Sequence, residues 1–327
     1  MTAVKFIASA GYSPNRIVTN EELSQFLETS DEWIVSHTGI KQRHYAIDEN
    51  TSDLATRVAE KLLQQANLKA TELDLIIVST ITPDALTPAT AAIVQRNIGA
   101  TDAFAYDLSA ACAGFIFALA TAHKFISSGA YRRAMVISAE TNSKMMDFTD
   151  RTSTVFFGDG AAGVIIEANA DSTKDAFLAE KLCTLGNAEV IHSGRVVPLS
   201  EVKATNYPKL DAFYQDGRAV YNFVTDEVTA HIDQFLAENE IKPTELDLVI
   251  THQANLRLIE KIAAHLGLGM DKFMIDVDEV GNTSSAGIPL CLAKALQQGK
   301  RPQKVLLTGF GAGLAYGSIL LDLSNFA

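Results

Sequence analysis

An internal repeat restricts the possible fold of this chain more than any other feature of its sequence. The segment TELDLIIVST at residues 71–80 returns as TELDLVITHQ at residues 244–253. Farther along, AFAYDLSAACAG at 103–114 corresponds to KFMIDVDEVGNTSSAG at 272–287, and their ends, CAG at 112–114 and SAG at 285–287, are again 173 residues apart. Units that recur in the same order predict two similar halves rather than two unrelated domains.

Each half alternates apolar, strand-like segments with amphipathic helices. The helix expected before the second copy has apolar residues every three or four positions, namely Val224, Val228, Ile232, Phe235 and Leu236. This alternation predicts an α/β fold made of two pseudo-symmetric βα halves, each with a mainly parallel sheet. We expect an N-terminal half at 1–170 and a C-terminal half at 219–327, with the polar segment 171–218 inserted between them.

Composition excludes several classes of protein. Hydrophobic residues make up 47% of the 327 residues, which is typical of a globular core, and a formal charge of −12 argues against nucleic-acid binding. No apolar run approaches the roughly 20 residues that span a bilayer, so we expect a cytoplasmic protein without a membrane partner. The cysteines at 112, 183 and 291 are far apart, which predicts neither a disulfide framework nor a metal site.

Cys112 lies in a predicted turn between the strand segment AYDL and the helix segment AGFIFALATAHKF. The partial positive charge at a helix N-terminus lowers the pKa of a thiol, which predicts a nucleophilic thiolate. The alternative is that Cys112 is a small buried hydrophobic residue, as most free cysteines are, and composition alone favours this alternative.

Two turns in the second half carry polar side chains at comparable places. His252 follows the strand segment of the second repeat, and Asn282 lies in the turn that corresponds to the one with Cys112. Taken singly, the histidine is an ordinary surface or packing residue and the asparagine an ordinary turn residue. A pseudo-twofold axis would bring all three side chains together, as a nucleophile with two hydrogen-bonding groups.

These motifs resemble those of β-ketoacyl-acyl carrier protein synthase III, the initiating condensing enzyme of bacterial fatty acid synthesis. The resemblance covers nearly the whole chain and includes TSDEWIVSHTGIKQRH, AACAGF, DRTSTVFFGDGAAG, HQANLR, GNTSSAGIP and GFGAGLAYGS. It implies a thiolase-like fold layered α-β-α-β-α and a homodimer. It also implies a decarboxylative Claisen condensation of an acyl-CoA primer with malonyl-acyl carrier protein, in which both are substrates and no cofactor takes part.

The resemblance assigns roles to the polar turns. Cys112 would take the acyl group as a thioester, and the backbone N–H groups of Cys112 and Ala312 would form the oxyanion hole. His252 and Asn282 would donate hydrogen bonds to the malonyl thioester oxygen, where negative charge develops as carbon dioxide leaves.

Binding residues carry over in the same way. Trp33 and Arg151 match a pair that stacks on the CoA adenine, and Asn255 matches a position near the pantetheine arm. Arg257 and Lys261 remain for docking the acidic carrier protein. At three other positions His37, Asn222 and Ala264 replace basic residues that are common in relatives. The expected docking patch therefore has few basic residues.

Thr87 marks a difference from the family. It precedes Pro88, so it is either a plain helix N-cap or part of a loop that borders the acyl pocket of the partner subunit, where phenylalanine is frequent. In the second case, threonine leaves more room in the pocket, which predicts that the protein accepts branched acyl primers and primers longer than acetyl.

Two alternatives remain open from the sequence. A starter-type ketosynthase or acyltransferase of secondary metabolism would keep Cys112, His252 and Asn282. A Cys-His-Asn thioester hydrolase would use the histidine as a base close to the thiol.

Overall fold

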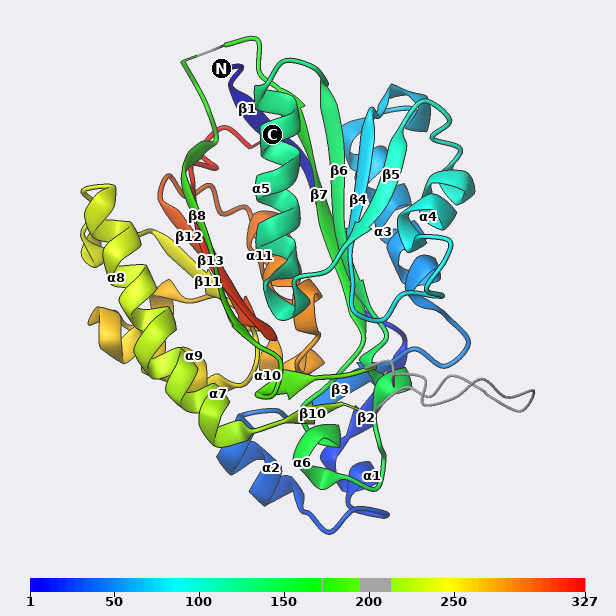
Figure 1. Ribbon diagram of the computed structural model, residues 1–327, viewed down its shortest axis with the longest axis vertical. Helices are drawn as coiled ribbons and strands as arrows, with labels where there is room; N and C mark the ends of the chain where they lie inside the picture. Colours follow the sequence, from blue (N-terminus) through cyan, green and yellow to red (C-terminus); the bar gives the residue numbers. More distant parts are fainter. Residues whose placement is uncertain (172, 195–212, 327) are drawn as a thin grey trace, which may run out of the picture.

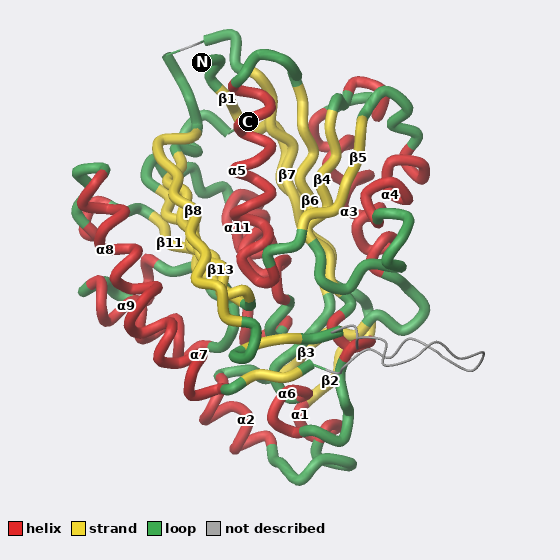
Figure 2. Tube along the Cα trace, viewed as in Figure 1, coloured by secondary structure: helices red, strands yellow, loops and turns green. Residues whose placement is uncertain are grey.

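The computed structural model describes residues 1–171, 173–194 and 213–326. Two main sheets face each other across a pair of helices (Figures 1 and 2). The first sheet has the order β1-β7-β6-β4-β5, with strands Val4–Tyr12, Gly160–Ala168, Arg133–Glu140, Leu75–Ser79 and Phe104–Leu108. The second has the order β11-β12-β13-β8, with strands Leu248–Thr251, Val305–Gly311, Gly313–Leu321 and Phe177–Asn187.

Helices form three layers around these sheets. The central layer is α5 (Gly114–Ser127) and α11 (Gly287–Gln297), whose apolar side chains pack with both sheets in one core. The outer face of the first sheet is covered by α3 (Thr51–Ala66) and α4 (Thr90–Ile98), and that of the second by α8 (Thr229–Glu238) and α9 (Leu256–Leu266). The predicted α-β-α-β-α layering is therefore confirmed. No helix in the described ranges is long and apolar enough to cross a membrane.

Shorter elements gather at one end of the layers, at the bottom of Figure 1. They are α1 Asn20–Leu23, α2 Asp31–Thr38, β2 Arg16–Thr19, β3 Gln42–Tyr45, α6 Arg151–Thr154, β9 Ile191–His192, β10 Tyr214–Gln215, α7 Gly217–Phe223 and α10 Val277–Val280. The strands among them pair as β2 with β3 and as β9 with β10, both antiparallel.

The repeat in the sequence is a repeat in backbone conformation. The 3₁₀ turns Ala70–Glu72 and Pro243–Glu245 precede the equivalent strands β4 and β11, and in each the last glutamate accepts a hydrogen bond from the backbone N–H of the lysine before the turn. Left-handed residues also recur 173 positions apart, at Asn67 with φ 51° and Glu240 with φ 56°. In the second half, an isolated parallel bridge between Val249 and Phe273 takes the place of the β4–β5 pairing.

The segment 171–218 contributes to the second half. Its strand β8 pairs antiparallel with β13, as β1 pairs with β7 in the first sheet. The predicted insertion thus contains an edge strand of the second sheet, and part of it, 195–212, lies outside the described residues. Only the first residue of β8 is buried and the others are half-buried or exposed, which is compatible with the polar character of this segment. The division into 1–170, 171–218 and 219–327 stays a prediction.

Truncation of a side chain in the central layer tests the core. Leu119 of α5 is fully buried, and we expect Leu119→Ala to lower the free energy of unfolding by about 2–5 kcal/mol, through lost apolar burial and a cavity. Lys124→Ala, at an exposed position of the same helix, should cost less than about 1 kcal/mol. Denaturant unfolding measures both values, and equal effects would contradict the assignment of α5 to the core.

Candidate active site

Cys112 lies in the 3₁₀ turn Ala111–Ala113 that leads directly into α5. The preceding residue, Ala111, has φ 47°, in the left-handed region that non-glycine residues rarely adopt. Ser284, the equivalent residue of the second half, has φ 52° and begins the turn Ser284–Ala286 that leads into α11. Both halves therefore hold a strained turn at the start of their central helix, and strain of this kind is frequent at functional sites.

The two turns contact each other through side chains. The sulfur of Cys112 lies 3.4 Å from Oγ of Ser284. The backbone N–H of Ser284 donates to Oδ1 of Asn282 at 2.9 Å. Because this bond engages the oxygen of the amide, the NH₂ group of Asn282 is turned the other way and is available as a donor. Sequence reasoning missed Ser284, although its place beside the counterpart of Cys112 was visible in the repeat.

A buried carboxylate supports the second turn from the first sheet. One oxygen of Glu140, at the end of β6, accepts a hydrogen bond from Oγ of Ser285 at 2.7 Å. The other oxygen accepts bonds from three donors of the strand-to-loop segment 80–82, two hydroxyls and one backbone N–H. Burial raises the pKa of Glu140, while these hydrogen bonds act in the opposite direction. No local pattern in the sequence distinguishes this glutamate.

His252 follows β11 and is held rigidly. Its backbone N–H donates to the carbonyl of Thr308 at 2.8 Å, and its ring meets Phe310 edge-on at 5.1 Å between centroids. Only 3% of the residue is exposed, and Nδ1 has no hydrogen-bond partner among the described residues. Burial lowers the pKa of His252 to about 3, so the imidazole is neutral at physiological pH.

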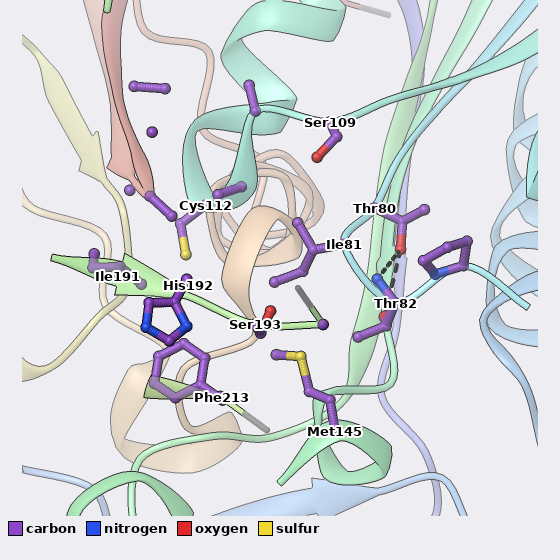
Figure 3. A pocket seen from close by; sticks show the side chains of 18 of the residues that line it. Thr80, Ile81, Thr82, Ser109, Cys112, Met145, Ile191, His192, Ser193 and Phe213 are labelled. Carbon is purple, nitrogen blue, oxygen red and sulfur yellow. Dashed lines mark hydrogen bonds between the residues drawn. The ribbon is translucent and has the colours of Figure 1, made fainter. Parts of the chain in front are cut away.

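One cavity of about 1500 Å³ joins these groups. Cys112, His252, Asn282 and Ala312 all line it, so the structure brings the three predicted side chains together although they are up to 170 positions apart. Figure 3 shows the sulfur of Cys112 pointing into this space. Much of the remaining wall is apolar and includes Ile81, Leu86, Leu108, Met145, Met146, Phe157, Ile191, Phe213, Phe223 and Phe310.

Gly311 allows the end of β12 to approach the nucleophile. A Cβ atom at this position would lie 2.8 Å from the backbone nitrogen of Cys112 and 2.9 Å from its Cβ, so a larger residue would push the two segments apart. The next residue, Ala312, lines the cavity beside Cys112. This proximity is compatible with the predicted oxyanion hole.

Two family models for 3-oxoacyl-[acyl-carrier-protein (ACP)] synthase III match the chain, one at residues 106–186 and its C-terminal counterpart at 236–323. The chain is 60% identical over 321 residues to beta-ketoacyl-[acyl-carrier-protein] synthase III 1 of Lactiplantibacillus plantarum, covering 98% of this chain and 99% of that protein. The chain belongs to this family.

Solved structures agree with the assignment. The 3-oxoacyl-(acyl carrier protein) synthase III of Pseudomonas aeruginosa superposes with a TM-score of 0.89 at 34% identity, over 99% of both chains. The priming beta-ketosynthase of the R1128 polyketide pathway has a TM-score of 0.88 at 29% identity, over 98% of this chain and 97% of that one. The predicted thiolase-like fold is confirmed.

The ionisation of the nucleophile differs from the prediction made from the helix terminus. Burial raises the pKa of Cys112 to about 12; the hydrogen bond with Ser284 lowers it and the charge of Glu140 raises it further. Burial thus acts against the lowering of the thiol pKa that the helix start predicts. A thiolate inside the protein loses its hydration, and this loss outweighs the benefit of the helix start.

Trp33 and Arg151 come together from two short helices, α2 and α6. The guanidinium carbon of Arg151 lies 5.3 Å from the centroid of the Trp33 ring, and Nη1 of the same residue donates to the carbonyl of Glu28 at 2.6 Å. His37 stacks on the indole at 4.3 Å between centroids. The two predicted adenine-binding residues are adjacent, and their role stays a prediction.

The other predicted binding residues lie on α9. Asn255 is the N-cap of this helix, and its side chain accepts a bond from the N–H of Leu258 at 3.0 Å. Arg257 donates to the carbonyl of Ser36 and pairs with Glu260, while Lys261 is exposed. Asn255 is thus already used in helix capping, which sequence reasoning did not consider.

Thr87 is exposed and lies ahead of α4, whose N-cap is Ala89, so the interpretation of Thr87 as the helix N-cap is wrong. The carboxylate of Asp107 instead accepts the N–H groups of Thr90 and Ala91, both at 2.7 Å. Leu86 of the same loop lines the cavity of its own chain. The expected contact of Thr87 with a partner's acyl pocket stays a prediction.

The raised thiol pKa predicts how Cys112 reacts with an alkylating reagent. Because its pKa of about 12 lies far above neutral pH, the thiolate fraction and the iodoacetamide rate should rise about tenfold per pH unit from pH 6 to 9, without a plateau. Mass spectrometry of the Cys112 peptide measures this rate, and Cys112→Ala serves as the control. A plateau near pH 7 would show a stabilised thiolate and contradict the expectation.

Proposed function

We propose that this protein catalyses the decarboxylative Claisen condensation of an acyl-CoA primer with malonyl-acyl carrier protein, the initiating step of fatty acid synthesis. The observation that carries the proposal is the shared cavity, into which one chain places a thiol, an imidazole and a primary amide. The names of the family and of its relatives support the same activity. The reaction requires no cofactor, because the two substrates supply the reacting groups.

The first half-reaction acylates Cys112. Its sulfur bonds to the thioester carbon of the primer, the bond to the CoA sulfur breaks, and the thiol proton leaves with CoA. The imidazole of His252 is neutral, and its unprotonated nitrogen would relay this proton from the thiol to the leaving CoA sulfur. The backbone N–H groups of Cys112 and Ala312 would hold the carbonyl oxygen as it becomes negative; such donors are worth about two to three orders of magnitude in rate.

The second half-reaction makes the carbon–carbon bond. The malonyl carboxylate leaves as carbon dioxide, and the electron pair moves toward the thioester oxygen, which needs neutral or cationic donors. His252 is neutral, and the amide of Asn282 is oriented with its NH₂ group free because Ser284 holds its oxygen. The carbanion then attacks the carbonyl carbon of the acyl-cysteine, and the sulfur of Cys112 leaves as thiolate and takes up a proton from the solvent.

Residues of α2, α6 and α9 would bind the two large substrates. Stacking of Arg151 and Trp33 supports an adenine site at α2 and α6. For the acidic carrier protein we propose the exposed face of α9 with Lys261 and Arg257, although the contacts of Arg257 with Ser36 and Glu260 reduce its freedom. We also propose a cytoplasmic homodimer, in which the loop of Thr87 reaches the partner subunit.

The comparisons do not favour the two alternatives. The polyketide priming ketosynthase is 29% identical, whereas the Lactiplantibacillus plantarum synthase is 60% identical over nearly the same length. A thioester hydrolase would need neither a malonyl substrate nor two neutral donors to an enolate.

The proposed function is tested by separating acyl transfer, which requires the thiol, from decarboxylation, which requires the two hydrogen-bond donors. In the parent protein, a panel of acyl-CoAs with malonyl-acyl carrier protein should release labelled carbon dioxide and form a β-ketoacyl product. Cys112→Ser should abolish acyl transfer yet retain malonyl decarboxylation, because both donors remain. Asn282→Ala should slow decarboxylation by about 10²–10³. Thioester hydrolysis without a new carbon–carbon bond would refute the proposal, and loss of both activities in a folded Cys112→Ser protein would refute the separate roles.

Removal of the indole tests the adenine site. We expect Trp33→Ala to raise KM for acyl-CoA by up to about thirtyfold with kcat nearly unchanged, since stacking of the adenine against the ring and the cation is worth up to about 2 kcal/mol. Arg151→Lys, which keeps the charge without the planar stack, should act in the same direction. A truncated acyl thioester that lacks adenosine is the control, because both variants should use it as the parent does. A similar loss with the truncated substrate would exclude an adenine site.

A further inference from the structure

Glu140 is a buried carboxylate that the mechanism above does not use. It ends β6, has no exposed surface, and is not among the described residues that line the cavity. Its Oε2 accepts hydrogen bonds from the hydroxyls of Thr80 and Thr82 and from the N–H of Ile81, at 2.8–3.1 Å. Its Oε1 accepts from Oγ of Ser285 at 2.7 Å. A carboxylate without water needs such donors, so Glu140 and these four residues fix one another.

The bond to Ser285 anchors the strained turn of the second half. Ser285 follows Ser284, whose φ of 52° lies in the left-handed region. Backbone conformations of this kind persist only where surrounding contacts hold them. Ser284 in turn holds a proposed donor, since its backbone N–H binds Oδ1 of Asn282 at 2.9 Å. Loss of the anchor would therefore let the turn relax and release the amide of Asn282 from its orientation.

The two oxygens of Glu140 bind segments from different halves of the fold. The segment 80–82 belongs to the first half and lines the cavity together with Cys112 (Figure 3). Ser285 belongs to the second half and begins no contact with the cavity wall except through this carboxylate and the carbonyl of Ser79, at 3.3 Å. Glu140 thus sets the turn of Asn282 against the wall that carries the nucleophile.

We propose that Glu140 is a positioning residue for decarboxylation: through Ser285 and the turn 282–285 it orients the amide of Asn282 toward the malonyl thioester oxygen. Because Glu140 does not line the cavity, it acts through Asn282 and not on the substrate. The effect is one of geometry, since a misplacement of about 1 Å can cost about two orders of magnitude in rate. This inference rests on the proposed function, because it assigns a support to one of the two donors of that reaction.

A double-mutant cycle tests this role in the second half-reaction alone. Each protein is first acylated, intact-mass measurement confirms the acyl-enzyme, and labelled carbon dioxide from saturating malonyl-acyl carrier protein is followed in a single turnover. We expect Glu140→Ala to lower the rate constant about 10- to 100-fold. In an Asn282→Ala background, the same change should cause less than about a threefold further loss, because the amide that Glu140 orients is absent.

A conservative variant separates hydrogen-bond geometry from charge. In Glu140→Gln, the carbonyl oxygen can accept from the donors of 80–82, and the NH₂ group can donate to Oγ of Ser285. The proton of Ser285 can then be donated to the carbonyl of Ser79, which already lies 3.3 Å away. We therefore expect Glu140→Gln to restore the rate constant to within about threefold of the parent value.

Glu167→Ala is the matched control for a general loss of stability. Glu167 is a buried carboxylate of β7 that accepts a hydrogen bond from Nε of Arg133. These two residues pair at one end of the β6–β7 ladder, whereas Glu140 lies at the other end. Removal of Glu167 should destabilise the fold, because it leaves a half-buried cation without its partner, yet keep the rate of carbon dioxide release as in the parent.

The outcomes separate the two proposals. A parent that is not acylated, or that releases no carbon dioxide once acylated, would overturn the proposed function. A parent-like rate in folded Glu140→Ala, a further tenfold loss in the double variant, or a Glu140→Gln protein as slow as Glu140→Ala would overturn the role of Glu140 and leave the proposed function standing. If Glu140→Ala does not fold, Ser285→Ala removes the same hydrogen bond from the other side and decides by the same cycle.

Discussion

The contact between the two symmetry-related turns holds the site together. Cys112 and Ser284 meet at 3.4 Å because the central helices α5 and α11 both begin at the same place between the two sheets. Small residues make this approach possible: a Cβ atom at Gly114 would collide with the hydroxyl of Ser79 and touch Ser285. The left-handed residues at both turns are strained conformations that the surrounding layers must stabilise.

Burial sets the chemistry of the groups gathered there. It raises the pKa of the Cys112 thiol and lowers that of the His252 imidazole, so both are neutral at physiological pH. A neutral pair is compatible with a histidine that accepts a proton in one half-reaction and donates a hydrogen bond in the other. Preorganised donors in such an environment are stronger than in water, because little solvent competes with them.

Hydrogen bonds outside the reacting groups fix their orientation. Ser284 holds the amide of Asn282, and Glu140 joins Ser285 to the loop at 80–82 that borders the cavity. The bond between Ser285 and Glu140 crosses from one half of the fold to the other. The proposed active site is thus a product of the duplication, in which one half supplies the proposed nucleophile and the other the two proposed donors.

The sequence by itself determined the duplicated α/β architecture, because apolar periodicity and repeated turns are local patterns. It also placed Cys112, His252 and Asn282 at strand-to-helix turns. The pseudo-twofold relation between the two halves brings such turns together. Only the tertiary structure decided the direction of the Cys112 pKa shift and the contacts of Ser284 and Glu140 at the site. Desolvation and contacts between distant segments depend on what surrounds a side chain in space, and no local pattern along the chain encodes those surroundings.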